Sequence, residues 1–344
     1  MYASLLPAAV FGIRLGGMSG ETKLHVHLLS SPAAGHLAFL QELLAPAVIL
    51  SSGETIPPQT EILVGGRITA VALDALPHLR AFIVPWAGLP QNLADLLPDY
   101  PQLTVHNLHH NATPVAETAL ALLLAAAKQI QPLDQALRRG DWTVRDERWD
   151  QSMLLAGKTA LILGYGAIGQ KLAHYGRALG MRVLATRRRV ETDFDGVAHL
   201  YPPEQLADLL PQSQLLLVCL PLTPATEGII GAAELALLPE GAIVVNIGRG
   251  PVIDEAALYG ELRSGRLRAG LDVWYNYPAD AEARANTIPA SYPFHELENV
   301  VMSPHRAGGS DQTERLRLRA LADLLNTAAA GHPLPNQVDL ARGY

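Results

Sequence analysis

A glycine pattern in the middle of the chain constrains the fold more than any other feature. Gly164, Gly166 and Gly169 have the spacing G-x-G-x-x-G, directly after the apolar run Thr159 to Leu163 and directly before a helix-compatible segment. The first glycine permits a tight turn, the second a close approach of backbone to ligand, and the third close packing of helix on strand. The pattern predicts a strand, turn and helix unit whose helix N-terminus faces an anion.

Short apolar runs alternate with helical patterns on both sides of this unit, as expected of parallel sheets flanked by helices. We expect two doubly wound parallel sheets, Rossmann-like or flavodoxin-like, and therefore the α/β class. The first series of expected strands is Leu24 to Leu29, Val48 to Ser51, Ile62 to Val64, Ala81 to Val84 and Thr104 to Asn107. The second is Thr159 to Leu163, Arg182 to Ala185, Leu215 to Leu220, Ala242 to Ile247, Ala269 to Val273 and Val300 to Ser303.

The length of 344 residues exceeds the size at which one hydrophobic core is efficient, so two domains are expected. A closing helix, from about Asp311 to Ala330, is expected to return to the first unit. We therefore predict a discontinuous substrate domain of residues 18–111 plus 305–344, and an inserted NAD(P)-binding domain of residues 112–304. Residues 1–17 lack a basic start and an obvious cleavage site, and are expected to be a disordered extension.

The pair Thr113-Pro114 predicts an N-cap followed by proline at the first position of an almost wholly apolar helix, which runs to about Ile130. A helix that is apolar on every side must be buried between domains or between subunits. Because one small domain can hardly cover it, we expect a homodimer through the inserted domain.

The composition excludes several classes of protein. Apolar residues make up 49% of the chain and charged residues 17%, with a net charge of −7, which fits a compact soluble protein without a nucleic-acid footprint. The longest apolar stretch, Thr118 to Ala127, is shorter than the roughly 20 residues of a membrane span. Cys219 is the only cysteine, so a reducing, cytoplasmic location is expected, and no spacing supports a metal site.

The glycine unit indicates a dinucleotide, whose pyrophosphate binds the unpaired N–H groups of the helix. Enzymes that use NAD carry an acid at the end of the next strand, about 20 residues on, to bind the ribose hydroxyls. Here Arg187, Arg188 and Arg189 follow that strand. Guanidinium groups suit the 2′-phosphate of NADP, so NADP is favoured and NAD is less so; a solvated basic turn is the alternative.

Further motifs follow one order along the chain: Asn107 to Glu117, Leu220 to Thr226, Val245 to Glu255, Gly270 to Val273 and Ser303 to Gly309. From about Glu61 to Ala330 they resemble the D-isomer-specific 2-hydroxyacid dehydrogenase family. The resemblance implies, respectively, a hinge, a loop beside the cofactor, an arginine motif, a strand whose aspartate faces the nicotinamide, and a histidine motif. The expected cofactor contacts are Gly164, Gly166, Ala167, Ile168, Gly169, Arg187, Arg188, Arg189, Leu220, Pro221, Thr226, Ile247, Gly248, Arg249, Asp272 and His305.

The resemblance also implies hydride transfer between the nicotinamide and a small 2-oxo or 2-hydroxy acid, such as glyoxylate or hydroxypyruvate. Arg249 would anchor the substrate carboxylate, and His305 would exchange a proton with the substrate oxygen. The side chains suit these roles, because arginine is a permanent planar cation and histidine titrates near neutral pH. The expected substrate contacts are Trp86, Ala87, Gly88, Asn111, Arg249 and His305, with a place in the core as the alternative for Trp86.

The family pattern breaks at Tyr277, which precedes Pro278 where members carry a catalytic glutamate. We count Tyr277 as the third catalytic residue. A neutral phenol orients His305 but does not supply the negative charge that stabilises an imidazolium. Carboxylates on the following loop are the alternative, although charges on loops are usually solvated and a lid is favoured. These carboxylates are Asp280, Glu282 and Glu296.

Two other functions stay open. Formate dehydrogenases also lack this glutamate, and oxidising formate needs no proton from a histidine. A regulatory or scaffold protein of the same fold would bind the dinucleotide with little turnover. The missing glutamate favours the second, whereas Arg249 and His305 oppose it.

Overall fold

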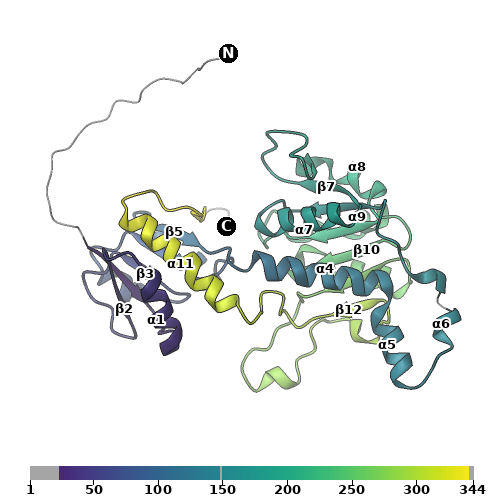
Figure 1. Ribbon diagram of the computed structural model, residues 1–344, viewed down its shortest axis with the longest axis horizontal. Coiled ribbons are helices and arrows are strands. Elements are labelled where there is room, and N and C mark those ends of the chain that lie inside the picture. Colours follow the sequence, from purple (N-terminus) through teal and green to yellow (C-terminus); the bar gives the residue numbers. More distant parts are fainter. Residues whose placement is uncertain (1–22, 148, 341–344) are drawn as a thin grey trace, which may run out of the picture.

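The computed structural model describes residues 23–147 and 149–340, which form two lobes joined by a narrow connection (Figure 1). Each lobe is built on a parallel sheet with helices on both faces, which confirms the expected α/β class. The chain passes to the larger lobe through α4 (Ala112–Lys128) and returns to the smaller one through α11 (Thr313–Ala329). Both ends of the described chain therefore contribute to the smaller lobe. The predicted extension, residues 1–17, lies outside the described residues.

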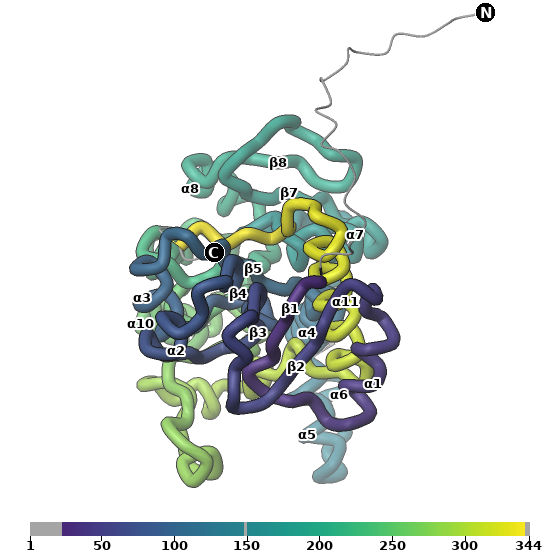
Figure 2. Tube along the Cα trace, turned by 90° about the vertical axis from the view of Figure 1, so that its left-hand side faces the viewer, coloured from purple at the N-terminus to yellow at the C-terminus, as the bar shows by residue number. Residues whose placement is uncertain are grey.

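The smaller sheet has the strand order β2-β1-β3-β4-β5. Helices α1 and α11 cover one face, and α2 and α3 cover the other. The C-terminal segment runs beside β5 (Figure 2), where Val338 N–H donates to Val105 O at 2.7 Å. The elements are β1 (Leu24–Leu28), α1 (Ala34–Leu43), β2 (Val48–Ser52), β3 (Ile62–Val64), α2 (Ala70–Asp74), β4 (Ala81–Val84), α3 (Gln91–Leu96) and β5 (Thr104–Asn107).

The larger sheet has the order β12-β11-β10-β9-β6-β7-β8, with α4 and α7 on one face and α8, α9 and α10 on the other. All six predicted strands are present. A seventh, β8, was not predicted, because it is three residues long and follows a polar loop at the edge of the sheet. The elements are β6 (Thr159–Leu163), α7 (Ala167–Ala178), β7 (Arg182–Thr186), β8 (His199–Tyr201), α8 (Leu206–Leu209), β9 (Leu215–Val218), α9 (Ala232–Leu237), β10 (Ile243–Asn246), α10 (Glu255–Arg263), β11 (Arg268–Leu271) and β12 (Val300–Met302).

Helix α4 differs from its prediction at both ends. Asn111 is the N-cap instead of Thr113, because the first intrahelical bond runs from Val115 N–H to Asn111 O at 3.0 Å. Pro114 still lies in the first turn, where a missing N–H costs nothing. The helix ends at Lys128, since Gln129 has a left-handed backbone with φ 54°, and α5 (Ile130–Arg138) begins next.

Helix α5 and the short α6 (Val144–Glu147) project from the larger lobe as an arm (Figure 1). Searched over the described residues, the helices include none with the length and apolar character that a membrane crossing requires.

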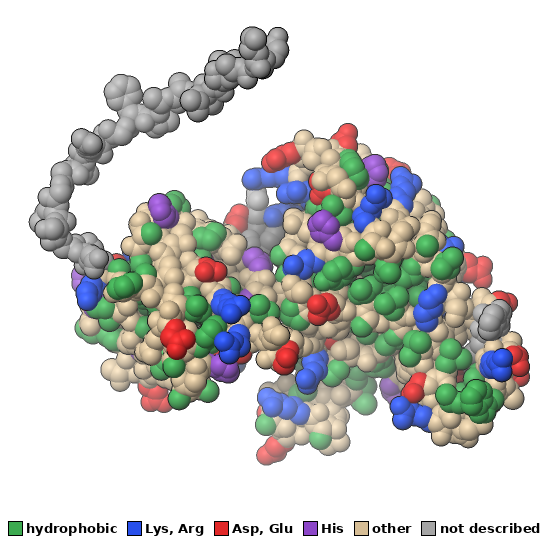
Figure 3. Space-filling model, viewed as in Figure 1, with side chains coloured by type: hydrophobic (Ala, Val, Ile, Leu, Met, Phe, Trp, Pro, Cys, Tyr) green, Lys and Arg blue, Asp and Glu red, His purple; other side chains and the backbone are tan. Residues whose placement is uncertain are grey.

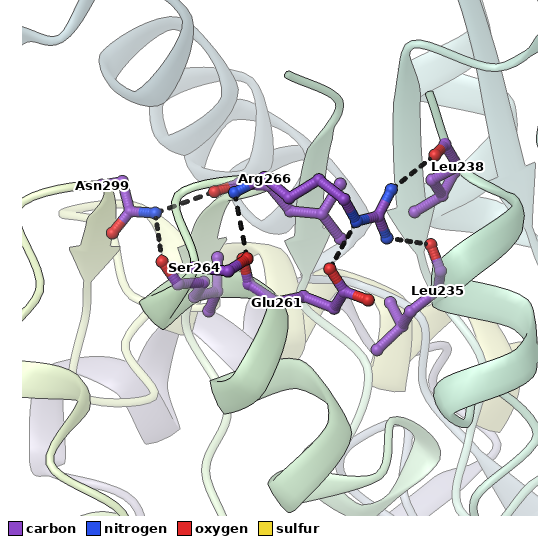
Figure 4. Close-up of polar contacts among 8 residues, drawn as sticks. Leu235, Leu238, Glu261, Ser264, Arg266 and Asn299 are labelled. Atoms are coloured by element: carbon purple, nitrogen blue, oxygen red, sulfur yellow. Dashed lines mark hydrogen bonds and ion pairs between the residues drawn. The ribbon is translucent and has the colours of Figure 1, made fainter. Parts of the chain in front are cut away.

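Polar contacts close the amino edge of the larger sheet (Figure 4). The Arg266 guanidinium pairs with Glu261 and donates to Leu235 O at 2.6 Å and Leu238 O at 2.7 Å. It thereby adds a donor to carbonyls at the end of α9, of which Leu235 O also accepts the Leu238 N–H at 3.1 Å. Asn299 donates from its amide to two further backbone carbonyls at 2.8 Å.

Candidate functional site

The glycine loop joins β6 to α7 at the carboxyl edge of the larger sheet. Gly164 has φ +95°, a conformation that side chains other than glycine rarely adopt. A Cβ on Gly169 would lie 2.2 Å from Gly164 O, so this position requires glycine for the helix to pack against the turn. A Cβ on Gly166 would meet nothing within 4 Å, which leaves open space before the first turn of α7. This geometry fits a pyrophosphate, because an anion there would meet the free N–H groups of α7.

The arginine segment follows β7, the neighbour of β6 in the sheet. Arg187, Arg188 and Arg189 are all exposed, and Arg187 N–H donates to Tyr201 O at 3.0 Å. Basic side chains gather over β7 and its following loop, on the side of the larger lobe that borders the gap between the lobes (Figure 3). A dinucleotide bound along the carboxyl edge would place its adenosine end beside this segment.

Two loops meet next to the glycine turn, after β9 and β10. A Cβ on Gly248 would lie 2.4 Å from Leu220 O, so the loops touch only because Gly248 lacks a side chain. Thr226 donates to Pro221 O at 2.6 Å and holds the first loop closed. Burial raises the pKa of the Cys219 thiol to about 12, which keeps the thiol neutral.

Arg249 follows β10 and reaches toward the smaller lobe. Its guanidinium donates to Gly248 O at 2.7 Å, and a Cβ on Gly88 would lie 2.7 Å from its Nη2. Among the described residues, no carboxylate lies within ion-pair distance of Arg249. Arg249 is exposed, so the N–H groups that it does not use for Gly248 O can receive an anion.

The loop after β4 carries three of the expected substrate residues, Trp86, Ala87 and Gly88. Trp86 is 41% exposed and stands over Gly66, so the alternative of a core position is wrong. Asn107, at the end of β5, donates to Ala87 O at 2.7 Å and fixes the loop. Gly88 of this loop is the residue that Arg249 approaches.

His305 lies on the loop after β12 with a left-handed backbone, φ 54°. Asp272 holds the loop on both sides of it, because its buried carboxylate accepts hydrogen bonds from Ser303 Oγ at 2.5 Å, Arg306 N–H at 2.8 Å and Ala307 N–H at 2.9 Å. Partial burial and then the positive charge of Arg249 lower the pKa of His305, whereas Asp272 acts to raise it. The charge of the guanidinium therefore acts on the imidazole.

Tyr277 lies against His305, with 5.4 Å between the ring centroids. Its phenol oxygen accepts the Trp274 N–H at 3.1 Å, and burial raises its pKa. The charged groups that act on His305 are Arg249 and Asp272. Among the three loop carboxylates, Asp280 bonds within its own loop and Glu296 lines a separate cavity at the amino edge of the sheet.

Comparison with known proteins decides the family. A family profile described as D-isomer specific 2-hydroxyacid dehydrogenase, NAD binding domain, matches residues 120–307. The chain belongs to the D-isomer specific 2-hydroxyacid dehydrogenases. It is therefore an oxidoreductase with an NAD(P)-binding domain, as the sequence predicted.

Relatives within the family have related activities. A glyoxylate reductase from Korarchaeum cryptofilum is 32% identical over 286 residues, which cover 79% of this chain and 80% of that one. A glyoxylate reductase from Aeropyrum pernix is 36% identical over 234 residues, 65% of each chain. The crystal structure of a family member from Xanthobacter autotrophicus Py2, in complex with NADPH and MES, aligns with a TM-score of 0.76 and 27% identity over 94% of this chain and 100% of that one.

Several contacts that support the dehydrogenase site were not predicted. Asp272 was expected to face the nicotinamide, and its observed bonds hold the His305 loop. Trp274 donates to Ser303 O at 2.8 Å and supports the same loop. Asn111, expected at the substrate, lies close to Gly308, where its Nδ2 would be 3.1 Å from an added Cβ. No local signal reveals these contacts, since the bonds of Asp272 and Trp274 join residues about 30 positions apart in sequence.

Proposed function

We propose that the chain is an NADPH-dependent reductase of a small 2-oxo acid, such as glyoxylate or hydroxypyruvate, or catalyses the reverse oxidation. One observation carries the proposal: the Arg249 guanidinium approaches Gly88 of the opposite lobe and has no carboxylate partner among the described residues. Its charge also acts on the imidazole of His305, whose pKa it lowers. Reduction of a 2-oxo acid requires a cation that binds the carboxylate and a titratable group that donates a proton.

The cofactor would be held by the carboxyl edge of the larger sheet. The turn at Gly164 and the open space at Gly166 support binding of a pyrophosphate, and the exposed arginines at 187–189 support a phosphate on the adenosine ribose. The crystal structure of the Xanthobacter relative is a complex with NADPH, which is consistent with this preference. When bound, the reduced nicotinamide supplies the hydride that reduces the carbonyl carbon. If the domains divide at residues 111 and 305, the substrate binds between the two lobes.

Each reacting side chain has a defined task in this proposal. Arg249 binds the substrate carboxylate through its planar fork and polarises the neighbouring carbonyl. Gly88 leaves room for that guanidinium. His305 donates a proton to the oxygen that becomes the hydroxyl, and Asp272 keeps the His305 backbone in place. Tyr277 packs against the imidazole in place of the family's glutamate.

Turnover of a substrate panel tests the function. NADPH absorbance should fall with glyoxylate or hydroxypyruvate, and formate should not reduce NADP or NAD. Oxidation of formate alone would establish the formate dehydrogenase chemistry instead. Tight binding of NADPH without turnover of any 2-oxo acid in the panel would favour a regulatory or scaffold role.

We further propose a homodimer through the larger lobe. Hydrophobic side chains gather over α4 and on the projecting arm (Figure 3). On and beside the arm, more than half of the surface of four large apolar side chains is exposed: Ile130, Leu137, Trp142 and Leu154. Burial of such a surface favours association. Light scattering at micromolar concentration should give twice the mass of one 36.9 kDa chain, and the mass of a single chain would contradict the proposal.

A further inference from the structure

Tyr165 occupies the variable position between the first two glycines of the G-x-G-x-x-G pattern. Its side chain is 6% exposed and packs in the core on the α4 and α7 face of the sheet. The phenol donates a hydrogen bond of 2.6 Å to Asp195 Oδ2. Burial, together with Asp195, raises the pKa of this phenol far above its usual value, so Tyr165 remains a donor at any working pH. A buried tyrosine here thus contacts a segment 30 positions away.

Asp195 closes the loop that carries the arginine segment. The loop leaves β7 with Arg187, turns back where Phe194 bridges His199, and returns as β8. The second oxygen of Asp195 accepts Val197 N–H and Ala198 N–H, each at 2.9 Å. One carboxylate therefore shapes the turn and also connects it to Tyr165.

The glycine loop and the arginine loop are joined at two points. At the first, Thr186 O accepts Tyr165 N–H at 3.1 Å, directly before the arginines. At the second, the Tyr165 phenol binds Asp195 at the far end of the same loop. Arg187 lies close enough to Tyr165 for its charge to lower the pKa of the phenol, against the larger effects of burial and Asp195. Fixing both ends of a loop restricts the positions that its arginines can take.

We propose that Tyr165 is a positioning residue which, through Asp195, holds the arginine loop in register with the glycine loop and thereby sets the preference for NADPH over NADH. The inference rests on the proposed use of NADP. It concerns the 2′-phosphate alone, because NADH lacks this phosphate.

Equilibrium binding of NADPH and NADH to the full-length protein tests this inference. Tyr165→Phe keeps the ring and removes the donor, so the Kd for NADPH should rise about tenfold, the value of one hydrogen bond to a charged group, while the Kd for NADH changes less than twofold. Asp195→Ala removes the same bond and also the two bonds of the turn, so the Kd for NADPH should rise at least as much. The double variant should bind NADPH no more weakly than Asp195→Ala alone, because the connection to Tyr165 is lost in both. Tyr175→Phe removes another tyrosine hydroxyl from α7 and should leave both constants unchanged.

The possible outcomes separate the two proposals. A wild type that binds NADPH no tighter than NADH contradicts the NADP preference itself, and this inference with it. A wild type that prefers NADPH, with an unchanged ratio in Tyr165→Phe, overturns only the inference. Equal weakening of both cofactors also overturns it, since that result marks a general distortion of the glycine loop. If Tyr165→Phe does not fold, the surface change Asp195→Ala decides by the same ratio.

Discussion

Two arginines at opposite edges of the larger sheet have opposite surroundings. Arg266, at the amino edge, pairs with Glu261 and donates to two carbonyls at the end of α9 (Figure 4). Arg249, at the carboxyl edge, is exposed and donates to Gly248 O of its own turn. A guanidinium has five N–H donors, so Arg266 uses most of its capacity on the fold, whereas Arg249 keeps most of its capacity for a ligand. The comparison separates a structural arginine from a binding one.

Left-handed backbone occurs at both edges of the larger sheet. At the amino edge the turn before β11 uses Gly265, with φ +79°, where a left-handed backbone costs little. At the carboxyl edge His305 adopts φ 54°, which costs on the order of 1 kcal/mol or more for such a residue. Three hydrogen bonds to Asp272 sustain it. Asp272 therefore stabilises a strained backbone at the edge where the chemistry is proposed, whereas Gln129, with the same φ of 54°, only ends α4 near the amino edge.

The largest expected effect comes from replacing each of the two arginines by alanine. Arg249→Ala should lower kcat/KM about a thousandfold with little change in stability, since it removes the charge that binds and polarises the substrate. Arg266→Ala should leave kcat/KM of the folded protein within about twofold and lower the free energy of unfolding by about 2 kcal/mol, because carbonyls lose their donors. Steady-state kinetics and urea unfolding measure both quantities. An equal loss of kcat/KM in both variants would contradict the distinction between a binding and a structural arginine.

A smaller effect is expected where the arginines bind phosphate. Arg187→Ala should raise the Kd for NADPH about tenfold and leave that for NADH unchanged, because one charge-assisted contact is lost. Titration of cofactor fluorescence gives both constants, with Arg182→Ala, at the opposite end of β7, as the matched control. Equal constants for NADPH in Arg187→Ala and wild type would assign that segment to a solvated turn.

The smallest effect concerns the proton. His305 must be protonated to reduce a 2-oxo acid, and its protonated fraction is lost as pH rises through its pKa. Because burial and Arg249 lower that pKa, the falling limb of the pH profile should lie below the ordinary range of histidine. Tyr277→Glu should move the limb to higher pH by about one unit, since a nearby carboxylate favours the imidazolium. Tyr277→Gln is the neutral control; a limb that stays in place in Tyr277→Glu would mean that position 277 does not face the proton donor.

The sequence predicted the parts of this molecule that depend on neighbouring residues. Apolar runs located every strand of both sheets except β8, and the glycine spacing located the turn at Gly164, because periodicity and turn geometry are local properties. The start of α4 was misplaced by two residues, since proline is tolerated throughout a first turn. The Asp272 contacts and the Tyr165 to Asp195 bond could not be predicted, because each joins residues about 30 positions apart without a local pattern.

Isotope transfer from the cofactor tests the central proposal most directly. NADPH labelled with deuterium at C4, in each of its two stereochemical forms, would be incubated with glyoxylate or hydroxypyruvate and the product examined by mass spectrometry. One of the two forms should yield a 2-hydroxy acid with deuterium at C2, and Arg249→Ala should abolish that product while still binding NADPH. Absence of labelled hydroxy acid from the wild type with both forms, under conditions where NADPH binds, would contradict the account.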